Sequence, residues 1–138
     1  MSASPTISAS ATILAVDDNL AFNYAICHML EQAGYQCLKA QTGSSALSVA
    51  ENGRPDLVLL DINLPDVNGF EVCRRLKSNP KTQNVPVVFL SATQTSAHAK
   101  EMGKSVGGDG FLFAPVETAQ LLTVIQGALL RSREARSA

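Results

Sequence analysis

The chain has 138 residues, of which 46 % are hydrophobic and 17 % charged, as expected for one globular domain. No apolar run approaches the ~20 residues that span a membrane. No basic residue precedes Lys39, so a secretory leader is not expected either. These features predict a cytoplasmic protein with no membrane partner.

Basic side chains are unevenly distributed along the chain. Residues 1–69 carry two of them and residues 70–138 carry nine. Those between 74 and 81 follow one predicted helix, and those between 131 and 136 lie at the end of another, where cations favour the helix dipole. A nucleic-acid binder would instead show a dense basic stripe with interleaved aromatic residues. We therefore expect no nucleic-acid partner.

Short apolar runs alternate with segments of helical periodicity. Strands are predicted at Ile13–Val16, Tyr35–Ala40, Leu57–Leu60, Val85–Leu90 and Gly110–Phe113. Helices are predicted at Leu20–Ala33, Ser44–Asn52, Gly69–Asn79, Thr95–Val106 and Val116–Arg133. The Ser- and Ala-rich residues 1–11 predict a disordered tail, residues 12–133 the folded domain, and residues 134–138 a C-terminal tail. Strands alternating with helices predict an α/β fold with a doubly wound parallel sheet.

Acidic residues end two of the predicted strands. Asp17 and Asp18 follow the first strand and Asp61 follows the third, so neighbouring positions for these strands would bring three carboxylates to one edge. Carboxylates that lie close together repel one another and raise their own pKa values unless a cation joins them. Hard oxygen ligands of this kind suit Mg²⁺ or Mn²⁺, which also neutralises phosphate charge. The simpler alternative is that these residues only cap helices, as Asp18 would for the first one.

Two further expectations concern residues within apolar stretches. Cys27, Cys37 and Cys73 are odd in number and have no metal-like spacing, which predicts reduced thiols in the core. Phe111 and Phe113, both on the last predicted strand, are expected in the core on opposite faces of the sheet.

Four motifs together carry a resemblance to a known family. They are "ILAVDDN" at 13–19, "LVLLDINLPDVNGFEV" at 57–72, "VVFLSAT" at 87–93 and "DGFLFAPV" at 109–116. In order and spacing, the chain resembles the receiver domain of bacterial response regulators over residues 12–131. The resemblance implies a flavodoxin-like, five-stranded parallel sheet of order 2-1-3-4-5 with five helices.

The resemblance also implies roles for the acidic residues. Asp61 is similar to the phosphoacceptor that takes a phosphoryl group from a histidine kinase or a phosphotransfer protein. Asp18 resembles the direct ligand of Mg²⁺ (or Mn²⁺), Asp17 the acid that acts through a water, and Asn63 the residue whose backbone carbonyl completes the site. Gly69 resembles a residue that, with a nearby proline, shapes the loop after the acceptor.

Other positions of the family tune or transmit the phosphorylation. The Asn63 side chain and Thr93 occupy positions that tune hydrolysis, and Ser91 and Phe111 match the pair that moves when the acceptor is loaded. The chain ends about 20 residues after the last strand, so output is expected by contact with a downstream protein. That contact is expected on the face formed by the fourth helix, fifth strand and fifth helix, and a homodimer is left open. The sequence is compatible both with a stand-alone protein and with a domain excised from a hybrid kinase.

One position departs from the family. Ala114 stands where the resemblance implies a lysine before Pro115, and a charge-assisted hydrogen bond from that lysine would contribute about 1.5–3 kcal/mol. The alternative function is therefore a phosphorylation-independent pseudo-receiver that binds partners without switching. An aspartate-nucleophile phosphatase fits poorly because it needs Asp-x-Asp where Asp17 and Asp18 are adjacent, and a flavodoxin would need a hydroxyl-rich phosphate loop there. In neither main hypothesis is the chain a classical enzyme.

Overall fold

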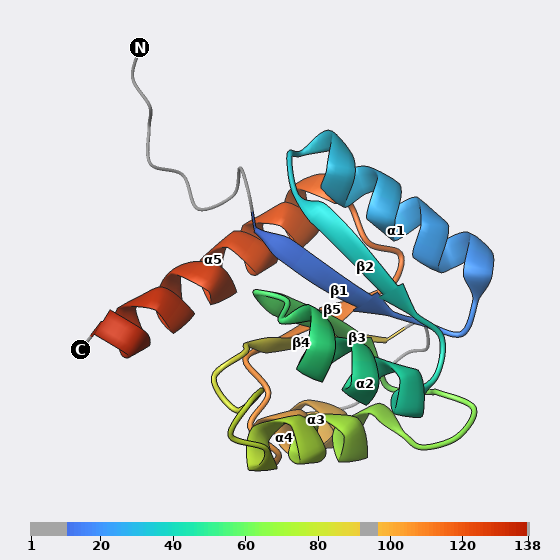
Figure 1. Cartoon of the computed structure of the whole chain (residues 1–138). Coiled ribbons are helices and arrows are strands. Elements are labelled where there is room, and N and C mark those ends of the chain that lie inside the picture. Colours follow the sequence, from blue (N-terminus) through green and yellow to red (C-terminus); the bar gives the residue numbers. More distant parts are fainter. Residues whose placement is uncertain (1–10, 92–96, 138) are drawn as a thin grey trace.

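The computed structural model describes residues 11–91 and 97–137 (Figure 1). The elements alternate in the order β1 (Thr12–Val16), α1 (Leu20–Gln32), β2 (Gln36–Ala40), α2 (Gly43–Gly53), β3 (Leu57–Asp61), α3 (Gly69–Ser78), β4 (Val87–Ser91), α4 (Ala97–Ser105), β5 (Gly110–Phe113) and α5 (Thr118–Ser137). The strands form one five-stranded parallel sheet of order β2-β1-β3-β4-β5. The predicted fold class and strand order are confirmed.

Helices cover both faces of the sheet. Helices α1 and α5 pack on one face, where Ile26 and Leu30 meet Leu121 and Ile125 over the strands. Helices α2, α3 and α4 lie on the other face (Figure 1). The result is a three-layer arrangement with a separate apolar cluster on each side of the sheet.

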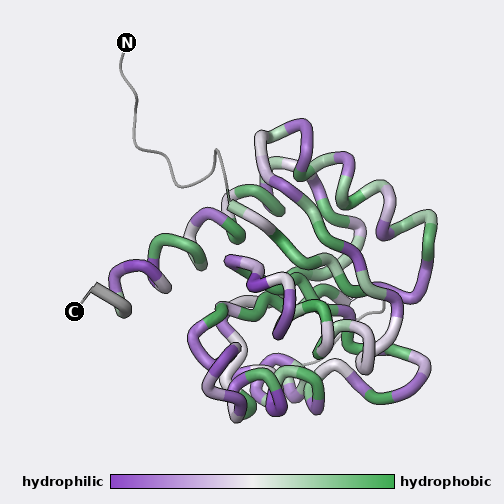
Figure 2. The backbone as a smooth tube through the Cα atoms, in the orientation of Figure 1, coloured by the Kyte–Doolittle hydropathy of each residue, from purple (hydrophilic) through white to green (hydrophobic). Residues whose placement is uncertain are grey.

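The central strands are the most apolar part of the molecule. Every residue of β3 and β4 is buried, as expected for strands covered on both faces. In Figure 2 the inner strands are mainly green, the colour of hydrophobic residues, and the purple of hydrophilic residues lies mainly on the outer turns of the helices. Each fully buried leucine or valine contributes about 1.5–3 kcal/mol relative to exposure. The residues that follow the carboxyl ends of β3 and β4 are therefore attached to two fully buried strands.

The last helix is longer than the sequence analysis predicted. It runs to Ser137 instead of ending at Arg133, and its C-terminal half extends past the strands (Figure 1). No glycine or proline follows Gly127, so the sequence contains no stop signal in this region. None of the helices in the described part of the chain is long and apolar enough to cross a lipid bilayer.

The cysteine prediction was wrong for two of the three residues. Cys27 on α1 and Cys37 on β2 form a disulfide, with their Cα atoms 5.8 Å apart. Parallel pairing of Cys37 with Ile13 of β1 places it beneath α1, and this proximity is invisible in the sequence. Cys73 is the buried free thiol that was predicted, and desolvation by burial raises its pKa to about 12.

The placement of Phe111 and Phe113 on opposite faces was also wrong. Their ring centroids lie 5.1 Å apart on one face of β5, and both side chains are half-buried. Side chains two residues apart in a strand point to the same side, whereas Leu112 between them is buried on the other side.

Candidate metal centre at the carboxyl edge of the sheet

The register of the sheet brings the three predicted aspartates together. Val16 pairs with Leu60 in the β1–β3 ladder, so Asp17, the next residue, lies level with Asp61 at the end of β3. One carboxylate oxygen from each of Asp17, Asp18 and Asp61 lies within 4.8 Å of the others. The expected convergence of these carboxylates is confirmed.

Backbone hydrogen bonds hold the first two aspartates in place. The Asp17 N–H donates to the Ala40 carbonyl at 3.0 Å, which extends the β1–β2 pairing by one residue. The Asn19 N–H donates to Asp17 Oδ1 at 2.9 Å. Asn19 is the N-cap of α1, since its side chain accepts from the Phe22 N–H at 3.0 Å. Asp18 is therefore not the helix cap, and its exposed carboxylate belongs to the acidic cluster.

A buried asparagine ties α1 to the same edge. The Asn23 side chain is 3 % exposed, and its Nδ2 donates to the carbonyls of Ala15, Asp17 and Ala40 at 3.2–3.5 Å. These bonds join the ends of β1 and β2 to the first turn of α1. They fix the backbone from which the carboxylates of Asp17 and Asp18 project.

The loop after β3 is pressed against Asp61. A Cβ on Gly69 would lie 2.3 Å from the Asp61 carbonyl oxygen, so only glycine fits there. The Gly69 N–H donates to the Ile62 carbonyl at 2.7 Å, and the Asn63 N–H donates to Asp61 Oδ1 at 3.2 Å. The loop-shaping role expected of Gly69 thus has a steric basis: it lets the chain fold back over the end of β3.

Asp66 anchors this loop to a neighbouring helix. Its two carboxylate oxygens accept from the N–H groups of Gly43 and Ser44 at 2.8 and 3.0 Å, at the N-terminus of α2. These two backbone bonds lower the pKa of Asp66 below its ordinary value. The second half of the loop is therefore held in place by the Asp66 contact and by the packing of Gly69.

Burial and mutual repulsion raise the pKa values within the cluster. Desolvation raises the pKa of Asp61 to about 6, with smaller upward contributions from the charges of Asp17 and Asp18 and a downward one from the Asn63 N–H. Desolvation also raises the pKa of Asp17, which is 6 % exposed. Within residues 11–91 and 97–137, no ion pair reaches any of the three carboxylates. A buried acidic group without a cationic side chain is chemically suited to a divalent cation.

The remaining predicted site residues lie on the neighbouring strands. Asp61 pairs with Leu90, so the buried Ser91 follows one residue further along β4, beside the acidic edge. Its carbonyl accepts from the Ala114 N–H at 2.8 Å, which brings the end of β5 alongside. Phe111 lies further back on β5 and pairs with Phe89. Thr93 lies outside the described residues.

The sequence also matches a known family across this fold. Residues 13–126, which include all four motifs and the acidic edge, match the family described as the response regulator receiver domain. The chain belongs to this family. Receiver domains are signalling modules of two-component systems, and they interact with histidine kinases or phosphotransfer proteins.

The relatives of this receiver domain differ in length, and some contain a long segment outside the part that matches it. It is 37 % identical over 119 residues to protein PilH of Pseudomonas aeruginosa, covering 86 % of this chain and 98 % of that one. It is 36 % identical to the phosphate regulon transcriptional regulatory protein PhoB of the same species, covering 88 % of this chain but only 52 % of PhoB. Among solved structures, the chemotaxis protein CheY4 of Vibrio cholerae superposes with a TM-score of 0.82 at 34 % identity, over 87 % of this chain and 99 % of that one.

Two structural residues of this receiver domain escaped the sequence analysis. Asn23 lies three residues before Ile26 and four before Cys27, which places it on the buried face of α1. A polar residue on a buried helix face needs hydrogen-bond partners, so this position could have been recognised as structural from the sequence. Asp66 had no such signal, because its partners Gly43 and Ser44 are distant in sequence and only the tertiary fold brings them near.

Proposed function

We propose that this receiver domain accepts a phosphoryl group on Asp61 from a histidine kinase or a phosphotransfer protein. The observation that supports it most is the acidic cluster, in which Asp61 lies within 4.8 Å of Asp17 and Asp18, at the end of a fully buried strand. The donor's phosphorus–nitrogen bond breaks as an Asp61 oxygen forms the new phosphorus–oxygen bond, and the histidine nitrogen keeps the bonding electron pair.

The cluster is also proposed to bind Mg²⁺ (or Mn²⁺). The carboxylates of Asp18 and Asp61 and the backbone carbonyl of Asn63 would supply hard oxygen ligands, which these cations prefer, and the carboxylate of Asp17 would act through a metal-bound water. A bound cation adds positive charge beside the phosphoryl oxygens. Binding also offsets the repulsion that, with burial, raises the pKa of Asp61 to about 6.

The residues around the acceptor are assigned supporting roles. The Asn63 side chain and Thr93 tune hydrolysis of the acyl phosphate, and the Ser91 hydroxyl donates to a phosphoryl oxygen. Ser91 suits this role because it is buried on β4, one residue beyond the partner of Asp61. Phe111 then changes its packing, and the α4–β5–α5 face changes its affinity for a downstream protein or for a second copy of the chain.

Labelling with radioactive acetyl phosphate tests the acceptor. We expect label on the wild type that is abolished by Asp61→Asn and by chelation of divalent cations. Asp56→Asn is the matched control, because Asp56 precedes the opposite end of the same strand and accepts from the Thr12 N–H. The proposal fails if Asp61→Asn is labelled like the wild type, or if Asp56→Asn loses the label as well.

The second candidate is a pseudo-receiver that binds partners without phosphorylation. It is favoured by Ala114 at the position where the family resemblance implies a lysine, and by the lack of any ion pair to the acidic cluster in the described residues. Beryllofluoride, a phosphoryl mimic, with Mg²⁺ distinguishes the two functions by amide spectra. Shifts near Ser91 and Phe111 support the switching receiver, and unchanged spectra at both support the pseudo-receiver.

A further inference from the structure

Phenylalanines gather in a row on one face of the sheet. The chain has five phenylalanines, and four of them form this row. The ring centroids of Phe70 and Phe89 are 5.1 Å apart, those of Phe89 and Phe111 are 5.7 Å apart, and those of Phe111 and Phe113 are 5.1 Å apart. The row runs from α3 across β4 to β5, so it ends beneath α4.

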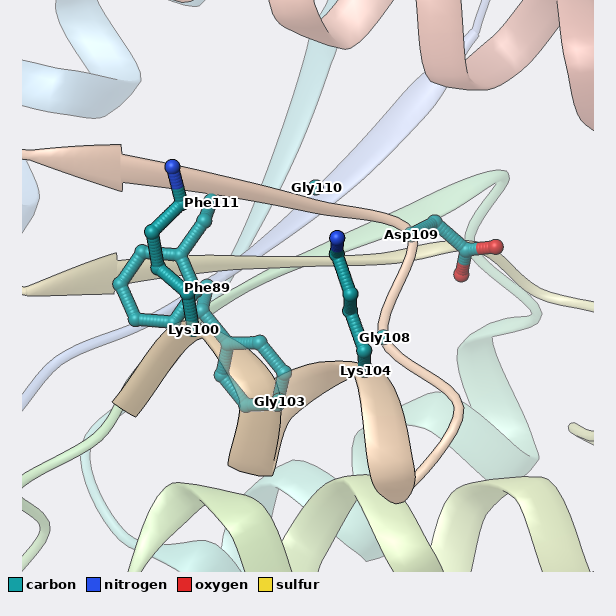
Figure 3. A pocket seen from close by; sticks show the side chains of 8 residues that line it. All are labelled: Phe89, Lys100, Gly103, Lys104, Gly108, Asp109, Gly110 and Phe111. Atoms are coloured by element: carbon teal, nitrogen blue, oxygen red, sulfur yellow. The ribbon is translucent and has the colours of Figure 1, made fainter. Parts of the chain in front are cut away.

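Helix α4 covers this row incompletely. Gly103 is its only buried residue, and Met102, its largest apolar side chain, is 38 % exposed. A cavity of about 290 Å³ remains between α4 and β5, with the rings of Phe89 and Phe111 on its wall. Gly103 and Gly108 also line it, and a Cβ on either would lie within 3.1 Å of the Phe89 ring, so glycine at both positions lets α4 and the turn after it approach this ring (Figure 3). The cavity is close in size to the smallest typical ligand pockets, about 300 Å³.

Two lysines stand at the opening of this cavity. Lys100 and Lys104 lie one turn apart on α4, and Figure 3 shows both side chains extending along the cavity. The Lys100 ammonium lies 5.9 Å from the centroid of the Phe113 ring. Neither lysine takes part in an ion pair with any residue that the structure describes. Their charge is thus available to an anion at the cavity.

Among the described residues, Asp109 is the one carboxylate that lines the cavity, and it already has two hydrogen-bond partners. Asp109 Oδ2 accepts from the Lys77 ammonium at 3.1 Å and from the Val87 N–H at 2.8 Å. In Figure 3 the Asp109 carboxylate points away from the two lysines of α4. Its negative charge is balanced by Lys77, so it leaves the positive potential at Lys100 and Lys104 largely intact.

We propose that the α4–β5 cavity is a binding site for a small planar aromatic anion. The ring of the ligand packs against the half-buried ring of Phe111, above the fully buried Phe89, and its carboxylate, sulfonate or phosphate lies between the ammonium groups of Lys100 and Lys104. Aromatic rings favour offset or edge-to-face contact with other rings. Exposed ammonium groups attract anions that lie closer to them than the Debye length. The site uses no residue of the acidic cluster, so binding to the unphosphorylated protein does not require Asp61, although Phe111 belongs both to the cavity wall and to the proposed switch.

Titration with 1-naphthoate, followed by amide spectra, tests the site. We expect saturable shifts at Gly103, Gly108 and Phe111. The double variant Lys100→Gln/Lys104→Gln should weaken binding about fivefold or more, since two exposed ion pairs are lost. Lys81→Gln, which removes an exposed lysine away from the cavity, is the matched control and should bind like the wild type. Asp61→Asn should also bind normally, which separates this site from phosphoryl acceptance.

Ligand analogues test the two halves of the recognition. Naphthalenemethanol lacks the charge and cyclohexanecarboxylate lacks the aromatic ring, so both should bind more weakly than 1-naphthoate. The proposal is overturned if naphthoate shifts no amide around the cavity, if the double lysine variant binds like the wild type, or if either analogue binds as tightly. Circular dichroism of the double variant checks that it is folded; both substitutions are at exposed positions.

Discussion

The most perturbed carboxyl group of the acidic cluster is that of Asp61. Its pKa is raised to about 6, first by desolvation and then by the charges of Asp17 and Asp18. A carboxyl group whose pKa is higher in the folded state stabilises the fold while it is neutral. This contribution is present in full below pH about 4, the ordinary pKa, and is lost as the pH rises through about 6.

Asp61→Asn removes this dependence on pH. In buffer with a chelator, we expect the variant to gain about 1–3 kcal/mol of unfolding free energy relative to the wild type between pH 4 and pH 7.5. Urea unfolding at several pH values measures it. Glu31→Gln, on the exposed side of α1, is the control and should keep a profile parallel to that of the wild type. If the unfolding free energies of Asp61→Asn and of the wild type change in parallel with pH, the pKa of Asp61 is not raised in the folded state.

At the scale of elements, the disulfide between α1 and β2 should stabilise the fold. It closes a loop of ten residues that also contains the turn at Gly34, where φ is +100°. Restricting the unfolded chain over such a loop contributes about 2–3 kcal/mol. We expect the unfolding free energy of the wild type, measured with urea, to be lower by this amount when a reductant is present.

Cys37→Ser is the variant that tests this disulfide. Its stability should not respond to reductant, because the bond is already absent. Cys73→Ser should keep the response of the wild type, since Cys73 is a free buried thiol on α3. If reductant leaves the wild-type midpoint unchanged although free thiols appear, the disulfide contributes nothing to stability.

The elements also show what the sequence could reveal and what it could not. Strands β3 and β4 were predictable because their continuous apolar runs follow from burial on both faces. The carboxylate cluster was predictable because parallel strands end at the same edge. The Cys27–Cys37 pair and the Asp66 contact were not predictable, because each forms only where the tertiary fold packs two different elements together. The end of α5 was missed because no stop signal marks it.

At the scale of the whole molecule, the acidic edge and the α4–β5 face are joined through two strand ends. Ser91 ends β4 beside Asp61, and its carbonyl accepts from the N–H of Ala114, the residue that follows β5. Phe113 pairs with Ser91, and its ring lies beneath the Lys100 ammonium. A change at Asp61 therefore has a short packed route to α4, but no cationic side chain links the two in the described residues.

Ala114→Lys supplies a cation at this junction. Under the proposed function, its ammonium pairs with Asp61 and then with the phosphoryl oxygens, a charge-assisted bond of about 1.5–3 kcal/mol. We expect uptake from acetyl phosphate to become about tenfold faster, the phosphoryl lifetime to change, and beryllofluoride shifts at Phe111 and Phe113 to grow. Ala114→Met, which adds similar length without charge, is the control and should behave like the wild type. If the methionine and lysine variants behave alike, packing rather than charge limits the coupling between Asp61 and β5.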